Sequence, residues 1–483
     1  MRGTKGTTIP LNCIDKGLLA LHSKHELVFN HLVLTIDGGV DPVRLKSALM
    51  TVLLRHPTLR SIIHAGIFRQ VREERSDYGD DILSVWDLAA PQEPVHADQS
   101  GIGTWYEGRL SEWMNRPLDP GKELPCRVLL LRRTLSQSSL VFTCLHSAAD
   151  GLHLLRFGGE VIQDYNGASE NPSPSTYSLT DGSRDELLAL ARARRLKVKH
   201  FHLRIIASLI HRFLLAPFSP NARICRRSSR RSAEIHFCQG SLNSHEVKQI
   251  RSRSKLVGAT LNDALLAACF KTVQEWNDAH GNPSRKISIM VPVDVSSGSP
   301  SPVSANQVSF ISVPTTREER DDPDELLRKV RQRTSHMLQN GVAFSIVYLV
   351  SFCSILSLLI TRAVANFLMV TRIYLDSILL TNVGLIWPKE SASMEGAKIG
   401  DARITSVVGL PPVVSPMGIS LCAGTYHDHL HIGLTYKSRH FSQAEAQLFL
   451  NLYLHEIRSY QRTPEGLLAP EVTQRETGVS APV

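Results

Sequence analysis

Strand-like segments followed by helix-like segments recur along both halves of this 483-residue chain. Residues 31–38, HLVLTIDG, alternate apolar and polar side chains as a half-buried strand does. Asp41 then has the residue type and the place of a helix N-cap, and Pro42 occupies the first helical position. This order predicts an α/β protein. Because a chain of this length without repeats exceeds one ordinary core, we expect two domains.

The same reasoning predicts elements on both sides of a polar loop at 167–184. The expected strands are at 126–132, 139–146, 287–293 and 306–313, and the expected helices are at 151–165, at 260–276 and from Asp322 onward. The predicted division is an N-terminal half (1–185), a basic linker and helix segment (186–232), a C-terminal half (233–462) and a disordered tail (463–483).

One short motif has the residue types of a catalytic site. His146 to Gly151, HSAADG, lie where the apolar strand VFTCL meets a turn and then a helix. An imidazole with a reference pKa of about 6.5 accepts a hydroxyl proton near neutrality. Asp150 would orient the loop, and Gly151 would let a ligand approach closely. A structural histidine near a helix start has the same pattern, so the motif by itself leaves both interpretations open.

The motif HSAADG resembles the HxxxDG signature of the CoA-dependent acyltransferase superfamily. This group includes peptide-synthetase condensation domains, alcohol acetyltransferases and wax-ester synthase/diacylglycerol acyltransferases. The resemblance covers roughly residues 10–462 in the right order. It is carried by HLVLTIDGGVDPVRLKSALMTVLLRHPTLRSII, GATLNDALLAACFKTVQEW, MVPVDV followed by NQVSFISVP, TNVG, and the closing hairpin and helix SPMGISLCAGTYHDHLHIGLTYKSRHFSQAEAQLFLNLYLHEI.

The resemblance implies two chloramphenicol-acetyltransferase-like α/β sandwich domains that form a V, with the active site at their interface. It implies that His146 is the general base of an acyl transfer, and that Asp150 holds the loop by an ion pair and hydrogen bonds. The donor would be an acyl-CoA or an acyl-carrier thioester, and the acceptor a small alcohol or amine. Neither a metal nor a prosthetic cofactor is implied.

Two departures from the superfamily's pattern bear on the reaction. Condensation domains carry a second histidine just before the catalytic one, and this chain has Leu145 there. The superfamily's arginine that would pair with the motif's aspartate aligns with Ser296. The plant-enzyme motif DFGWG is absent as well. Together these departures favour ester-forming, bacterial-type relatives over peptide bond formation and over plant-type enzymes. The Ser296 departure also leaves open a non-catalytic member that binds carrier proteins or acyl chains.

Three polar residues are candidates for substrate binding. Asn262 and Asp263 either cap and pack the start of a predicted helix or line the acceptor tunnel. The resemblance directs Asn382 of TNVG toward the active site, and turn chemistry explains this residue almost as well. His427, His429 and His431 alternate along one predicted strand. Without a nearby cysteine or acidic cluster, they indicate an exposed surface rather than a metal site.

The basic residues are concentrated in one segment. Twelve of the 54 lie between Glu186 and Glu234, where no acidic residue occurs, so the 42 that remain are fewer than the 45 acidic residues. Few stacking aromatics accompany them, which argues against nucleic acid. We expect residues 192–231 to contact an anionic membrane, CoA phosphates or an acidic carrier protein, with a solvated interdomain helix as the alternative.

Residues 342–361 form an uncharged run long enough to span a bilayer. A span would separate TNVG and the closing hairpin from His146, although the resemblance needs them in one fold. We therefore expect a buried or membrane-skimming helix, with an integral membrane protein as the alternative. The eight cysteines form no CxxC pair, and the N-terminus has no secretory signal. A cytoplasmic protein that is either soluble or associated peripherally with the membrane is the expectation.

Overall fold

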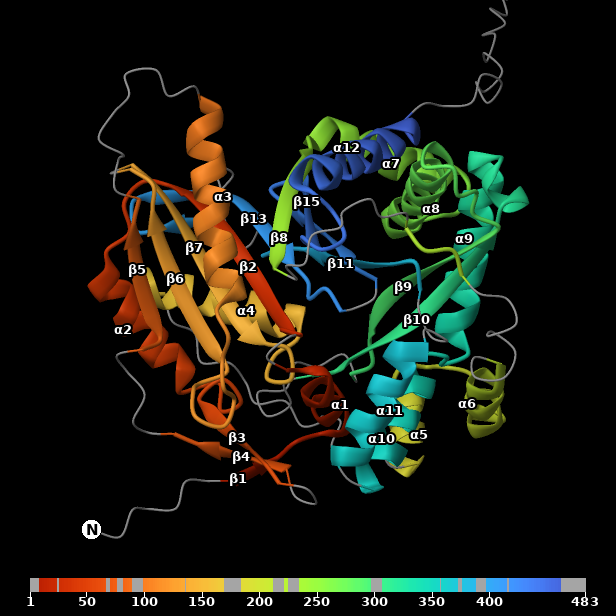
Figure 1. Ribbon diagram of the computed structural model, residues 1–483, viewed down its shortest axis with the longest axis horizontal. Coiled ribbons are helices and arrows are strands. Elements are labelled where there is room, and N and C mark those ends of the chain that lie inside the picture. Colours follow the sequence, from red (N-terminus) through yellow and green to blue (C-terminus); the bar gives the residue numbers. More distant parts are fainter. Residues whose placement is uncertain are drawn as a thin grey trace, which may run out of the picture.

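The structure is a computed structural model in which two α/β halves lie side by side (Figure 1). Figure 1 shows most elements of the N-terminal half on the left and most elements of the C-terminal half on the right. The structure describes residues 8–23, 26–66, 70–75, 81–88, 99–134, 136–168, 184–211, 221–224, 234–296, 306–356, 358–371, 376–387, 397–414 and 417–461. The predicted tail at 463–483, most of the loop at 167–184 and most of the basic stretch 212–233 lie outside these residues.

The N-terminal half is built on a six-stranded sheet in the order β12-β13-β2-β7-β6-β5. Its strands are β2 (Phe29–Asp37), β5 (Leu83–Asp87), β6 (Cys126–Arg132), β7 (Gln137–Leu145), β12 (Lys398–Ile399) and β13 (Ala402–Leu410). Helices α2 (Pro42–Leu53) and α4 (Gly151–Tyr165) share one apolar core with this sheet. As predicted, Asp41 caps α2 by accepting a hydrogen bond from the Val43 amide, and Pro42 is the first helical residue.

The C-terminal half has a second six-stranded sheet, in the order β10-β9-β11-β14-β15-β8. Its strands are β8 (Ile235–Leu242), β9 (Lys286–Asp294), β10 (Val308–Thr316), β11 (Ile378–Leu385), β14 (Ile419–Tyr426) and β15 (His429–Lys437). The core of this half includes residues of α7 (Ser244–Leu256), α8 (Leu261–Ala279), α9 (Pro323–Gln339) and α12 (Gln443–Ser459). The strands and helices predicted here are confirmed to within a few residues at their ends.

The predicted boundary between the halves needs one correction. The predicted C-terminal half includes residues 398–410, but β12 and β13 complete the N-terminal sheet, where β13 pairs antiparallel with β2. The chain therefore crosses back before returning to the C-terminal sheet at β14. A third apolar cluster joins the halves: α3 (Gln99–Asn115) packs through Trp113 against the N-terminal sheet and the start of β8. The two halves are thus fastened by shared strands and by shared core.

The remaining helices lie near the base of the molecule as drawn in Figure 1. They are α1 (Cys13–Leu21), α5 (Arg184–Ala193), α6 (Phe201–Ile210), α10 (Phe344–Leu356) and α11 (Leu358–Thr371). A small sheet of β1 (Thr8–Pro10), β4 (Gln70–Glu74) and β3 (Ser61–Ala65) adjoins them. The 3₁₀ turn Glu318–Arg320 precedes α9.

The uncharged run 342–361 forms two helices rather than one, α10 and the start of α11. The first turns of α10 are buried through Phe344 and Val347, whereas Phe352 and Leu359 are exposed. In the part of the chain that the structure describes, no single helix is both long and apolar enough to cross a membrane. Two bent helix pairs meet the test by length and composition alone, one of them α9 with Phe344–Cys353.

Candidate active site

The HSAADG motif lies at the junction of β7 and α4, as predicted. β7 ends at Leu145, and the amide of His146 donates to the Val28 carbonyl at 2.9 Å. The amides of Ala148 and Ala149 turn back to the carbonyl of Leu145. Asp150 then caps α4 by accepting from the His153 amide at 2.8 Å. These hydrogen bonds satisfy backbone amides of the turn and of the first turn of α4 that would otherwise lack a partner. They therefore restrict the conformation of the loop.

A cavity of about 300 Å³ opens beside this motif, at the boundary between the halves. His146, Asp150 and Gly151 line it from the N-terminal half, and Asn382 and Asp294 line it from the C-terminal half. A Cβ atom added to Gly151 would meet no other atom within 4 Å, consistent with a backbone that faces open space. The other walls of the cavity are mostly apolar. They are formed by Leu32, Leu154, Leu155, Pro292, Val308, Leu379, Val383, Ile386, Leu410, Pro411, Pro412 and Cys422.

His146 lies beside this cavity as an uncharged imidazole. Burial lowers the pKa of His146 below its usual value, an effect that the nearby Asn306 side chain and Asp15 carboxylate oppose. The imidazole is therefore uncharged at neutral pH and able to accept a proton. Its Nδ1 atom is buried and has no hydrogen-bond partner among the described residues.

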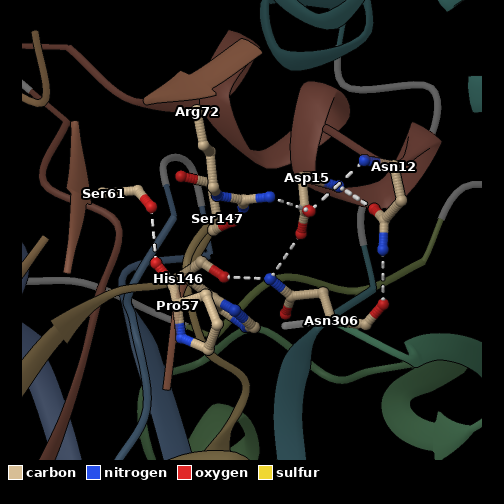
Figure 2. A network of polar contacts seen from close by, with 8 residues as sticks. All are labelled: Asn12, Asp15, Pro57, Ser61, Arg72, His146, Ser147 and Asn306. Carbon is tan, nitrogen blue, oxygen red and sulfur yellow. Dashed lines mark hydrogen bonds and ion pairs between the residues drawn. The ribbon is translucent and has the colours of Figure 1, made fainter. Parts of the chain in front are cut away.

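A buried polar network supports the loop that carries the HSAADG motif (Figure 2). The Arg72 guanidinium pairs with Asp15 at 2.9 Å, and both side chains are only 1% exposed. The same guanidinium donates to the carbonyl of Ser147. The Asn306 side-chain amide donates to Asp15 at 2.9 Å and to the carbonyl of His146. Three elements far apart in sequence thus fix two consecutive carbonyls of the motif.

Further bonds tie this network to its own supports. Asn12 and Asp15 form the capping box of α1, and the Asn12 side chain donates to the Asn306 carbonyl at 2.9 Å. The sequence reasoning missed Asp15, Arg72 and Asn306. Asn306 was within reach, because it begins the segment NQVSFISVP on which the resemblance partly rests. Nothing in the sequence pattern marks Asp15 or Arg72.

Asp150 is stabilised by backbone donors. Besides the His153 amide, its carboxylate accepts from the Gln307 amide at 3.2 Å, which links α4 to the C-terminal half. Burial raises the pKa of Asp150 to about 6, although both amides favour the charged form. The expected hydrogen bonds are present, but no basic side chain pairs with Asp150 within the described residues.

Ser296, which aligns with the superfamily's arginine, is itself contacted by an arginine from another part of the chain. Arg194 donates to the Ser296 carbonyl at 2.6 Å and pairs with Asp294 at 3.5 Å. Asp294 lines the cavity together with Asp150, and its charge adds to the rise in the pKa of Asp150. A basic residue from the linker therefore neutralises the second carboxylate of the cavity rather than the first.

Of the three other predicted site residues, one lines the cavity and two do not. Asn382 lines the cavity from β11, and its side-chain oxygen accepts from the Gly384 amide at 3.0 Å, so it shapes a turn as well. Asn262 and Asp263 lie in the first turn of α8 and are not among the residues that line the cavity. Asp263 completes a capping box with Thr260 and accepts from the Thr334 hydroxyl. The cavity therefore gives their predicted contact with substrate no support.

The described residues contain no group of three His, Cys, Asp or Glu side chains that could hold a metal ion. Of the three alternating histidines, His431 is hydrogen-bonded to the Ser406 hydroxyl and His429 to the His427 carbonyl. The walls of the cavity, which are mostly apolar, fit an apolar ligand with a few polar atoms.

Comparison with known families accounts for most of the chain. Residues 5–282 match the family model of the condensation domain, and residues 304–449 match that of the WS/DGAT C-terminal domain. Uncharacterized proteins from two strains of Mycobacterium tuberculosis are each 25% identical over 401 residues, which is 80% of this chain and 85% of theirs.

Solved structures with the same fold cover nearly the whole chain. The first condensation domain of the calcium-dependent antibiotic synthetase, in complex with a substrate analogue, gives a TM-score of 0.66 at 12% identity, over 95% of this chain and 98% of that one. The epimerization domain of the third module of tyrocidine synthetase B gives 0.63 at 15% identity, over 95% and 97%. The predicted fold of two chloramphenicol-acetyltransferase-like α/β domains is confirmed. Since one of these structures is a condensation domain and the other an epimerization domain, the fold alone does not select the chemistry.

Proposed function

We propose that this chain, which belongs to the condensation-domain family, moves an acyl group from a thioester to the hydroxyl of a small-molecule acceptor. Its two family matches support acyl transfer in general. The observation that carries the finer proposal is His146, whose uncharged imidazole lines a cavity between the halves. The donor is an acyl-CoA or an acyl-carrier thioester, and an amine is the alternative acceptor.

In the proposed reaction, His146 accepts the proton of the acceptor hydroxyl as its oxygen attacks the thioester carbonyl. The new C–O bond forms, a tetrahedral intermediate collapses, and the C–S bond breaks. The proton held by the imidazole then passes to the departing thiolate. Because both substrates reach one base in a single cavity, the reaction needs no acyl-enzyme and no bound cofactor.

Leu145 supports transfer to oxygen over transfer to nitrogen, since the second histidine of peptide-forming relatives is missing. A second candidate is a non-catalytic protein that binds acyl chains or carrier proteins, favoured by the absence of a cation next to Asp150 among the described residues. Purified protein with octanoyl-CoA should release free CoA only when an alcohol is added. Saturable octanoyl-CoA binding without such release would favour the non-catalytic candidate.

We also propose that the protein is cytoplasmic and that it contacts anionic membranes through residues 192–231. Exposed Arg192, Lys197 and Lys199 adjoin α6, on which Leu203 and Ile206 are 65% and 41% exposed. Each basic residue near an anionic surface contributes about 1 kcal/mol. Arg226, Arg227, Arg230 and Arg231 carry the same expectation but lie outside the described residues.

Vesicle sedimentation tests this contact. Binding to phosphatidylserine vesicles should weaken steeply as salt rises above 0.1 M, where the screening length is already about 10 Å. Lys197→Gln with Lys199→Gln should weaken it, whereas Arg251→Gln with Lys255→Gln, on exposed positions of α7, should not. Equal binding to zwitterionic vesicles, or recovery only with detergent at any salt, would contradict the proposal and restore the integral alternative.

A further inference from the structure

One polar side chain beside the cavity has no role in the proposed reaction. His31, in β2, is among the residues that line the cavity and is itself only 3% exposed. Its Nδ1 atom is hydrogen-bonded to the Thr143 hydroxyl at 2.9 Å, and its side chain makes no other hydrogen bond to the described residues. Two other polar side chains that line the cavity already make hydrogen bonds within the protein. Asn30 donates to the Ala149 carbonyl at 2.9 Å, and Asn382 accepts from the Gly384 amide.

The hydrogen bonds around Thr143 decide which imidazole nitrogen carries the proton. The Trp113 indole, which can only donate, donates to the Thr143 hydroxyl oxygen at 2.9 Å. The hydroxyl proton of this buried residue then needs an acceptor, and the acceptor within reach in the described structure is Nδ1 of His31. Nδ1 must therefore be unprotonated. Burial and the nearby Arg127 lower the pKa of His31 to about 3, so the ring is neutral and its proton is on Nε2.

We propose that the Nε2–H group of His31 is a substrate-recognising donor that selects a ligand bearing a carbonyl, hydroxyl or ether oxygen away from the reacting carbon. This inference depends on the proposed function, because it describes the substrate of the proposed acyl transfer. His31 pairs with Thr143 in the sheet, three residues before His146, which separates the two positions by about 10 Å along the strands. At that separation His31 reads a different part of the ligand from the one that His146 deprotonates.

The surroundings of His31 make this donor selective. Leu410, Pro412 and Cys422 contribute apolar surface to the same cavity. If a saturated chain binds beside the buried N–H group, the group stays without a hydrogen bond and binding is weakened by its desolvation. A ligand oxygen at the same place accepts a hydrogen bond and offsets that cost. Acyl chains or acceptors with an oxygen-bearing chain are thus the substrate class that this cavity favours over plain hydrocarbon chains.

The tautomer is tested directly by nitrogen-15 NMR of histidine-labelled protein. We expect a histidine that stays neutral from pH 5 to 8 with its proton on Nε2, and its signals should be absent from His31→Gln. Assignment of the proton to Nδ1 of His31 would overturn the proposal. This readout needs no turnover, so it stands or falls separately from the proposed acyl transfer.

Ligand preference is tested with two probes of equal shape, octan-2-one and 2-methyloct-1-ene, which differ in a carbonyl oxygen against a methylene. Titration should perturb the His31 Nε2 signal with octan-2-one alone. His31→Leu should weaken octan-2-one binding about tenfold and leave the alkene unchanged, the worth of one hydrogen bond. His31→Gln, which keeps an N–H near the same place, should restore part of the loss. Equal binding of both probes by the wild-type protein would contradict the inference.

Discussion

Replacing His146 with Ala should slow acyl transfer by about 10²–10⁴-fold while leaving the protein folded. This is the usual contribution of a positioned general base. Thermal stability should change little, because the buried Nδ1 atom makes no hydrogen bond within the described structure and the ring borders a cavity. The measurement is the rate of acceptor-dependent CoA release, alongside a thermal unfolding curve.

The matched control for this variant is His245→Ala. His245 is exposed on α7, away from the cavity lining, and should retain full activity. A His146→Ala protein that transfers acyl groups at the wild-type rate would remove the base from the mechanism. Loss of activity in both variants would point to the preparation rather than to the imidazole.

Replacing Arg72 with Met should destabilise the protein by about 3–5 kcal/mol, because it leaves the buried Asp15 carboxylate without its cation. Activity should also fall at least tenfold among the molecules that remain folded. The reason is that the Ser147 carbonyl loses its donor, and the loop that carries His146 is no longer fixed from behind. Denaturant unfolding and turnover measured well below the midpoint report the two effects separately.

A second variant separates positioning from stability. Arg72→Met combined with Asp15→Asn removes the unpaired charge and should recover part of the stability. It should not recover activity, since the Ser147 carbonyl still lacks its donor. Arg132→Met, which breaks the exposed pair with Asp87, is the control and should leave both quantities unchanged. Recovery of full activity in the double variant would show that Arg72 acts through stability alone.

Local chemistry made much of the fold predictable. The capping pair Asp41–Pro42, the alternating strand before it and the helix that begins at Gly151 each depend on neighbours within a few residues. The motif that carries His146 was predictable for the same reason: strand, turn and N-cap are all encoded within the chain from 137 to 165. The resemblance supplied the arrangement of the halves.

Long-range pairing was not predictable from these patterns. Arg72 and Asp15 are 57 positions apart, and Asn306 and Asp15 are 291 apart, so no periodicity connects them. β13 joins the N-terminal sheet although it lies late in the chain, because β2 offers it a free edge. The proton on His31 follows from a tertiary contact with Trp113 and Thr143, which a sequence pattern does not contain.

The measurement that tests direct acyl transfer most closely is mass spectrometry of a single turnover, with protein in excess over octanoyl-CoA and an alcohol present. The wild-type protein should give the octanoyl ester and free CoA in equal amounts. The intact protein should gain no octanoyl mass at any time, because His146 deprotonates the acceptor and never carries the acyl group. An octanoylated protein that precedes the ester, or hydrolysis with no ester at all, would contradict the mechanism.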